Sequence, residues 1–173
     1  MAIQKNDCVE LHYTGTISVD GTVFDTTEER VAKEHHIENV SGKPAIICVG
    51  QGFLPKGVED SLLGKDVGEY TFALPPERAF GKKNAKLITL IPTKKFIEQK
   101  IRPIPNLSVN VDGMVGIIKS VSGGRTIVDF NHPLANKDVT YVVLVKRILI
   151  DAQEKVTAIL THLFGLRDVV VKK

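Results

Sequence analysis

Two strand-like runs on either side of the dipeptide Asp20-Gly21 constrain this chain more than any other feature. An Asp-Gly pair commonly turns a β-hairpin, so residues 11–15 and 21–26 are predicted to lie on neighbouring antiparallel strands. Such a hairpin brings the Tyr13 hydroxyl, the Phe24 ring and the Asp25 carboxylate close together. The hairpin alone also fits an ordinary core that buries a tyrosine and a phenylalanine, so its meaning depends on the segments around it.

The segments on both sides of the hairpin predict a mixed α and β body. Residues 7–14 alternate as a strand, and a helix capped by threonine is expected within residues 26–34, closed by His35 and His36. Residues 44–49 are predicted as a buried strand and residues 50–57, rich in Gly and Pro, as a shaped loop. A short helix over 58–63 is ended by Gly64, and residues 67–74 alternate as a further strand.

The pattern changes at Lys86, where a second set of elements begins. An apolar strand over 87–91 precedes a short helix over 93–99, and strands over 114–121 and 125–130 flank the turn 122–124. A segment with its own strands, helix and turn is typical of a small domain rather than a loop. Residues 139–150 then alternate as a long final strand.

The C-terminal residues predict a helix. Asp151 is the expected N-cap and Glu154 the partner that completes a capping box. Apolar side chains recur at helical spacing at Val156, Ile159, Leu160, Leu163 and Phe164, and Gly165 ends the run. The sequence is compatible with a helix that packs against the rest of the chain, and equally with one that mediates self-association or binds a partner.

Charge is unevenly distributed along the 173 residues. Residues 86–127 hold seven basic and two acidic side chains, a net charge of +5, which leaves −2 for the rest of a chain whose net charge is +3. This indicates an acidic partner or RNA, or a solvated face that keeps an apolar surface soluble. Phe96 is the only aromatic residue of that segment, which argues against stacking on nucleic-acid bases.

The two cysteines, Cys8 and Cys48, are expected as buried thiols in a reducing cytosol, with a single disulfide as the alternative. No apolar stretch is long enough for a membrane span, and the first residues lack the apolar region of a secretory signal, so we expect a cytoplasmic protein without membrane contact. His35 and His36 have no further ligands at metal spacing, so no metal and no cofactor are expected.

Three further segments follow the hairpin in a fixed order: GQGFLPKGVE at 50–59, GKDVGE at 64–69 and PPERAFG at 75–81. Together they resemble the FKBP family of peptidyl-prolyl cis-trans isomerases. The stretch DFNHPLANKD at 129–138 is similar to the point where SlyD-like members re-enter the isomerase domain after a chaperone domain inserted in the flap. Asn136 stands where these members commonly have Gly, and asparagine tolerates a left-handed backbone next best.

The resemblance implies an α+β fold: an antiparallel sheet wrapped around a short helix, with a small, mainly β insert and a C-terminal helix. It predicts a discontinuous isomerase domain over residues 1–85 and 128–150. The insert-in-flap domain would cover 86–127, and the helical extension 151–173.

The residues that match the family's pocket are Tyr13, Phe24, Asp25, Leu54, Pro55, Val58, Phe80 and Tyr141. On this resemblance Phe24 and Tyr141 are walls for the prolyl ring, Val58 is its floor, and Leu54 and Pro55 form one rim. Phe80 would approach the substrate carbonyl, and Asp25 with the Tyr13 hydroxyl would form a polar edge. An apolar pocket penalises the planar, charge-separated amide more than the twisted transition state, so catalysis needs no nucleophile and no general base.

Three departures from the family pattern bear on ligand binding. Val58 replaces the tryptophan that is usual in animal members, as is typical of the SlyD-like branch. Pro55 has no N–H for the carbonyl of the family's macrolide inhibitors, and Phe80 replaces a tyrosine donor, so tight macrolide binding is not expected. The nickel-binding tail of bacterial SlyD proteins is not carried over, because this tail has only His162.

The predicted insert holds more apolar side chains than a domain of about 40 residues readily buries. An exposed apolar groove suits unfolded or nascent chains that carry X–Pro bonds, and its expected contact residues are Leu90, Ile91, Phe96, Ile97, Met114 and Ile117. Full mutual coverage of strands and helix is the alternative. The leading hypothesis is an isomerase that assists protein folding; a holdase with weak or lost isomerase activity and a ribosome- or RNA-associated factor stay as alternatives.

Overall fold

The chain forms two compact units in the computed structural model, which describes the backbone of residues 1–164 and the side chains of residues 1–161. Unit 1 combines Met1–Phe80 with the chain from Lys137 onward, and unit 2 is Gly81–Asn136. The expected insert, 86–127, lies inside unit 2, which begins five residues earlier and ends nine residues later. The added residues belong to unit 2 because Lys83 and Asn84 bond to Asp129 and Asn131.

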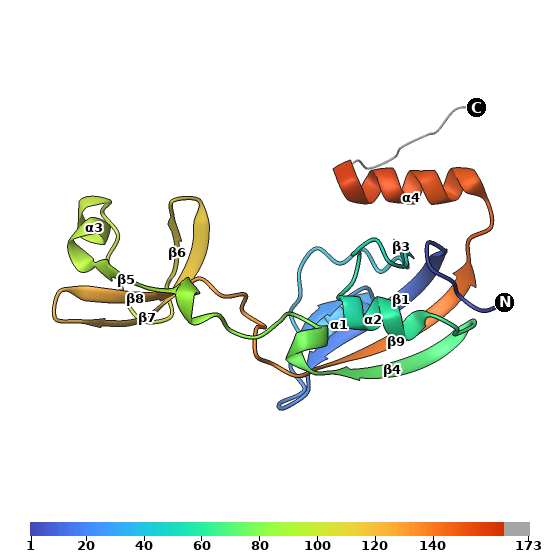
Figure 1. Cartoon of the computed structure of the whole chain (residues 1–173), viewed down its shortest axis with the longest axis horizontal. Coiled ribbons are helices and arrows are strands. Elements are labelled where there is room, and N and C mark those ends of the chain that lie inside the picture. Colours follow the sequence, from blue (N-terminus) through green and yellow to red (C-terminus); the bar gives the residue numbers. More distant parts are fainter. Residues whose placement is uncertain (165–173) are drawn as a thin grey trace. The chain divides into compact units, whose positions relative to one another are not determined.

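Unit 1 is an antiparallel sheet of five strands (Figure 1). Its order is β2-β1-β9-β4, and β3 pairs with β1 beside β2. The strands are β1 (Cys8–Ile17), β2 (Val23–Thr26), β3 (Ala45–Cys48), β4 (Gly68–Leu74) and β9 (Val139–Ile148). The first hairpin and the long final strand are therefore confirmed, and β9 joins β1 to β4 at the centre of the sheet.

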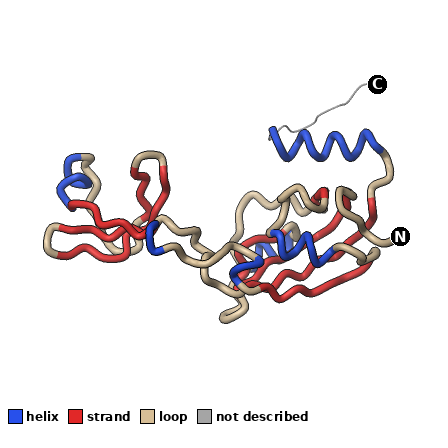
Figure 2. Tube along the Cα trace, in the orientation of Figure 1, coloured by secondary structure: helices blue, strands red, loops and turns tan. Residues whose placement is uncertain are grey.

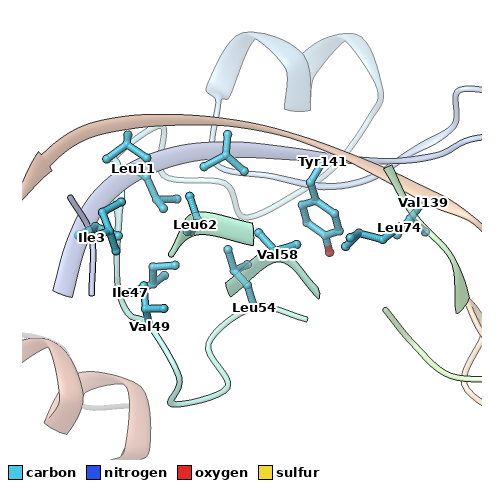
Figure 3. Close-up of a cluster of buried hydrophobic side chains, with 13 residues drawn as sticks. Ile3, Leu11, Ile47, Val49, Leu54, Val58, Leu62, Leu74, Val139 and Tyr141 are labelled. Carbon is cyan, nitrogen blue, oxygen red and sulfur yellow. The ribbon is translucent and has the colours of Figure 1, made fainter. Parts of the chain in front are cut away.

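The helix α2 (Lys56–Leu62) packs its apolar side against the sheet. Val58 and Leu62 are fully buried and lie beneath the strands that carry Leu11 and Tyr141 (Figure 3). Gly64 follows the helix with a positive φ of 76°, the conformation that ends helices most easily at glycine. The expected α+β fold with a sheet around a short helix is confirmed.

The helix α1 (Glu29–Glu34) begins without the expected threonine cap. Its N-cap is Glu28, whose side chain makes no capping bond. Thr27 does not cap the helix, because its hydroxyl accepts a hydrogen bond from the Tyr13 N–H at 3.0 Å. The predicted cap is therefore wrong, whereas the helix ends at His35 as expected.

Cys8 and Cys48 form a disulfide, so the prediction of two free thiols is wrong. The two residues are direct partners in the β1–β3 pair, and both are buried. Antiparallel pairing places opposite side chains within reach of each other, and this register could not be deduced from the sequence. The disulfide packs in a small cluster with Leu149 and Ile159.

The C-terminal helix α4 (Ala152–Phe164) docks on unit 1 beside β3. Asp151 caps it by accepting the Glu154 N–H at 2.9 Å, as predicted. The Glu154 carboxylate does not complete a capping box, because it accepts hydrogen bonds from Arg147 instead. The expectations for the side chains of His162, Leu163 and Phe164, for Gly165 and for the rest of 165–173 lie outside the described residues.

Unit 2 is a four-stranded antiparallel sheet with a short helix, and strand dominates its regular structure (Figure 2). The order is β5-β8-β7-β6, with β5 (Ile88–Pro92), β6 (Ser108–Val111), β7 (Met114–Ser122) and β8 (Arg125–Asp129). The helix is α3 (Thr93–Glu98), and single 3-10 turns occur at Ala85–Leu87 here and at Pro76–Arg78 in unit 1. Strand β6 and the 3-10 turn at Ala85–Leu87 were not predicted; the other three strands and the helix of unit 2 were.

A small apolar core holds unit 2 together. Its buried members are Ile91, Phe96, Val109, Ile118 and Val128. Gly81 and Asn136 mark the two ends of the unit: the Asn136 N–H donates to the Gly81 carbonyl at 2.8 Å. Asn136 adopts the left-handed backbone expected for it, with φ of 66°. Within residues 1–164, no helix has both the length and the apolar character of a membrane span.

Candidate active site

A β-bulge in the first hairpin directs the side chains of the site. Gly15 pairs with Asp25 and Thr16 pairs with Val23, so Phe24 is an extra residue without a partner on β1. Bulges re-aim neighbouring side chains, which lets Phe24 and Asp25 serve the same site. The Tyr13 hydroxyl donates to the Asp25 carboxylate at 3.0 Å, which forms the expected polar edge.

Two aromatic rings pack edge to face on the Phe24 ring. Its ring centroid lies 5.6 Å from that of Phe80 and 5.7 Å from that of Tyr141, both at steep interplanar angles. Gly15 makes this packing feasible, since a Cβ there would lie 2.7 Å from the Phe24 ring and 3.1 Å from that of Tyr141. Gly15 was part of the sequence motif, but its role as a spacer was not predicted.

The buried carboxylate of Glu59 shapes the loop that forms the rim. It accepts the backbone N–H groups of Gly50 at 2.7 Å, Gly52 at 3.3 Å and Leu54 at 2.9 Å. A carboxylate that accepts several backbone bonds holds a loop of glycines in one conformation. Glu59 is thus a structural residue of the site that sequence reasoning missed, although it stands in the motif at 50–59.

Together these elements line a concave cavity of about 350 Å³ that is open to solvent. The residues that line it are Tyr13, Asp25, Gly52, Phe53, Leu54, Pro55, Ala79, Phe80 and Tyr141. Six of the eight predicted pocket residues are among them. Phe24 and Val58 are not: the half-buried Phe24 ring packs edge to face on the rings of Phe80 and Tyr141, and Val58, a residue of α2, is fully buried in the core.

The two tyrosines of the cavity keep their protons throughout the physiological range. Burial, followed by the Asp25 carboxylate that accepts its hydrogen bond, raises the pKa of Tyr13 well above the ordinary value. Burial, with smaller contributions from Asp25 and Tyr13, raises the pKa of Tyr141 in the same direction. The cavity therefore presents two neutral hydroxyls and one carboxylate among aromatic and aliphatic side chains.

Residues 1–101 match the family described as FKBP-type peptidyl-prolyl cis-trans isomerase. This chain belongs to that family. Residues 89–134, all within unit 2, match the family described as FKBP26, IF domain.

Curated relatives of this FKBP chain extend over most of its length. It is 34% identical over 149 residues to the short-type peptidyl-prolyl cis-trans isomerase of Methanocaldococcus jannaschii, which covers 84% of this chain and 94% of that protein. It is 35% identical over 153 residues to the FKBP-type 16 kDa peptidyl-prolyl cis-trans isomerase of Escherichia coli K12; the match covers 85% of this chain and 94% of that protein. It is 28% identical over 160 residues to the FKBP-type peptidyl-prolyl cis-trans isomerase SlyD of Vibrio cholerae; the match covers 90% of this chain and 73% of that protein.

The six predicted contact residues of the insert divide into two groups. Leu90, Ile97 and Met114 are exposed and Ile117 is half-buried. Ile91 and Phe96 lie in the core of unit 2 and are not available at its surface. The sequence could not show which of the six residues are exposed, because apolar residues occupy successive positions of these strands and so occur on both faces of the sheet.

Proposed function

We propose that this FKBP chain rotates X–Pro bonds in the 350 Å³ cavity of unit 1, and that unit 2 binds unfolded client chains through one face of its sheet. The observation that carries the first part is the cavity itself: rings of Phe80 and Tyr141, the rim of Leu54 and Pro55, and a single polar edge at Tyr13 and Asp25.

Rotation of an X–Pro bond suits such a site on physical grounds. The planar amide is stabilised by resonance that places charge on the carbonyl oxygen, and this charge is smaller in the twisted transition state. Walls that exclude water therefore disfavour the ground state more than the transition state. The chain supplies the walls, and the neutral Tyr13 hydroxyl stays fixed on Asp25 at the edge.

The second part depends on the face of the unit 2 sheet that points away from its core. Strand pairing places Leu90 opposite Ile127, and Ile88 and Ile117 both opposite Asp129, on that one face. Leu90 is 52% exposed and Ile88 is also exposed, while the alternate residues Ile91, Ile118 and Val128 are buried on the other face. Val115, two residues before Ile117 on β7, adds exposed apolar surface to this face, and Met114 is exposed on the other face of the strand.

An apolar face on a small sheet is suited to unfolded segments, because it offers contact area without a shape that selects one sequence. Exposed cations of the same unit, among them Lys119 and Arg125, keep this surface soluble. Partners of this kind are unfolded or nascent chains with accessible X–Pro bonds, and catalysis uses no cofactor.

Two rates test the proposal: X–Pro isomerisation in a short peptide, and refolding of an unfolded protein whose refolding is limited by proline isomerisation. Leu90→Asp should lower catalysis of refolding about fivefold, since about half of a leucine side chain no longer buries on the client. Peptide isomerisation should not change. Val19→Asp, which alters an exposed apolar side chain in unit 1, is the matched control and should change neither rate. Equal rates of refolding for Leu90→Asp and wild type would refute the client face, and absence of peptide turnover in the wild type would refute the catalytic cavity.

A further inference from the structure

A second, larger cavity of about 1200 Å³ adjoins the proline site within unit 1. Tyr13, Phe53 and Leu54 line both cavities, so the two meet at these side chains. The larger one continues along β3 and the end of β9, and α4 forms its other side. None of the pocket residues expected from the sequence, other than Tyr13 and Leu54, lies in it.

The larger cavity is a groove between β3 and α4, and one of its walls is the edge of a strand. Four consecutive residues, Pro44, Ala45, Ile46 and Ile47, all line it. Successive side chains of a strand point to opposite faces, so four residues in a row reach the groove only where the strand edge itself borders it. In the described part of the chain, β3 pairs with β1 alone, which leaves its other edge without a strand partner.

The opposite wall is one face of α4. Gln153, Glu154, Thr157, Ala158 and Thr161 line the groove, at the three- and four-residue spacing of a single helix face. Arg147 holds this helix in place: its guanidinium bonds to Glu10 at 2.6 Å and to Glu154 at 3.0 Å. The pair Lys155–Asp7, at 3.9 Å, adds a second tie, and Ile159 packs on the disulfide cluster.

We propose that this groove binds the part of the client chain next to the isomerised proline, as a short extended strand added to the free edge of β3. The inference rests on the proposed catalytic site, because the groove is continuous with it through Tyr13, Phe53 and Leu54. An extended polypeptide is the occupant that fits, since a free strand edge offers N–H and C=O groups in register for another backbone.

The groove also sets a preference for the side chains of that strand. Ile46 and Phe53, both half-buried, give it apolar contact surface, and Ile150 adds an exposed apolar side chain at its border. A client with aliphatic residues within a few positions of the proline, on the side that runs along β3, should therefore bind more tightly than one with small polar residues there.

The test compares three peptides of ten residues with one central X–Pro bond, titrated into the full chain by calorimetry. One carries Val and Ile on both sides of the proline, one carries Ser and Gly, and the third repeats the first with N-methylated flanking amides. The wild type should bind the apolar peptide about tenfold more tightly than the polar one, the gain expected when one further apolar side chain is buried. N-methylation should remove most of that gain, because methylated amides cannot bond to a strand edge.

Thr157→Trp places a large side chain in the groove, so this variant should bind the apolar and the polar peptide with about equal affinity. Val156→Trp is the matched control: Val156 is 43% exposed on α4 and does not line the groove, so the gain should persist. An equal gain in Thr157→Trp, or no effect of N-methylation in the wild type, would overturn the proposal. A dimer of the free chain that Thr157→Trp dissociates would also overturn it, since the groove would then hold a second copy. Turnover of a tetrapeptide, measured separately, reports on the proposed catalytic site and leaves the affinity ratio as an independent result.

Discussion

The two units both present apolar side chains, but they present them in different ways. In unit 1 the rings of Phe80 and Tyr141 and the rim of Leu54 and Pro55 line a concave pocket of about 350 Å³. In unit 2 the apolar side chains Ile88 and Leu90 lie exposed on a sheet face. A concave pocket surrounds a bound prolyl ring on several sides and so displaces water from around one bond. A sheet face contacts a ligand on one side only, and it accepts many sequences.

Apolar composition alone therefore does not separate the proposed catalytic pocket from the proposed client-binding face. The two differ in shape, because the elements of unit 1 form a concave pocket and the exposed side chains of unit 2 lie on one face of a sheet. In unit 1 the bulge at Phe24 and the loop fixed by Glu59 shape that pocket. In unit 2, α3 supplies Phe96 to the core on one face of the sheet, and the exposed residues lie on the other. Three predictions, from the largest expected effect to the smallest, sharpen this difference.

Phe24→Ala should lower kcat/KM for a tetrapeptide about 100-fold. Phe24 supports Phe80 and Tyr141 by edge contacts, each worth about 0.5–1.5 kcal/mol, and its loss leaves these two rings of the pocket wall without that support. Phe24→Leu, which keeps an apolar side chain of similar reach, should lose less. The measurement is protease-coupled peptide turnover, with circular dichroism as the check of folding. Full turnover by a folded Phe24→Ala variant would mean that the packing of the aromatic walls does not matter for catalysis.

Macrolide affinity should be about one to two decades weaker than in a family member with donors at both positions, since each lost hydrogen bond is worth roughly 0.5–1.5 kcal/mol net. Pro55 has no N–H, Phe80 has no hydroxyl, and the neighbouring Leu54 N–H is already bonded to Glu59 at 2.9 Å. The double variant Pro55→Ile with Phe80→Tyr should regain affinity in calorimetry. Undiminished affinity of the wild type would contradict the account of the rim.

Asp129→Asn should destabilise unit 2 by about 1–3 kcal/mol, the cost of weakening a buried hydrogen-bonded group. The Asp129 side chain is 6% exposed. Its carboxylate accepts from the Asn131 side chain at 2.7 Å and from Lys83 at 3.3 Å. Burial by itself would raise the pKa of Asp129, but the hydrogen bonds from Asn131 and Lys83 outweigh it, and the pKa lies below its ordinary value.

The lowered pKa fixes the sign of the pH dependence. The unfolded chain binds the proton of Asp129 more readily than the folded one, so this group stabilises unit 2 above the ordinary pKa of about 3.9 and ceases to do so as the pH falls through the folded value. Hydrogen exchange of amides around Ile118 should show this loss in the wild type and a flatter acid profile in Asp129→Asn. Amides of unit 1 are the internal control; a matching change there would mean that the two units do not unfold independently.

Local signals in the sequence were enough to predict most elements of both units. The turn at Asp20-Gly21, the helix stop at Gly64 and the cap at Asp151 each involve a few adjacent residues with a defined backbone requirement. Strand β6 escaped prediction because it is four residues long, buries only Val109 and follows a stretch broken by Pro103 and Pro105. Unit 2 extends beyond the predicted insert on both sides, because contacts such as Lys83 with Asp129 join residues far apart in the sequence.

Features of the site that depend on register could not be predicted. The Cys8–Cys48 disulfide follows from the pairing of β1 with β3, and the packing of Phe24 on the Phe80 and Tyr141 rings follows from one extra residue in β2. The family resemblance indicated which side chains gather at the site, and six of the eight line the cavity. It did not distinguish Phe24 and Val58, which support the cavity, from the residues that form its surface.

The division of labour between the units is tested most directly by removing unit 2. Gly81 and Asn136 are joined by a backbone hydrogen bond of 2.8 Å, so a short Gly-containing loop can replace residues 82–135. The shortened chain should keep turnover of a tetrapeptide within about twofold, since the cavity residues all belong to unit 1. It should lose about 100-fold on an unfolded protein, because the client is no longer held at high effective concentration. Equal losses in the two assays would contradict the account, because unit 2 would then shape the catalytic cavity instead of holding the client.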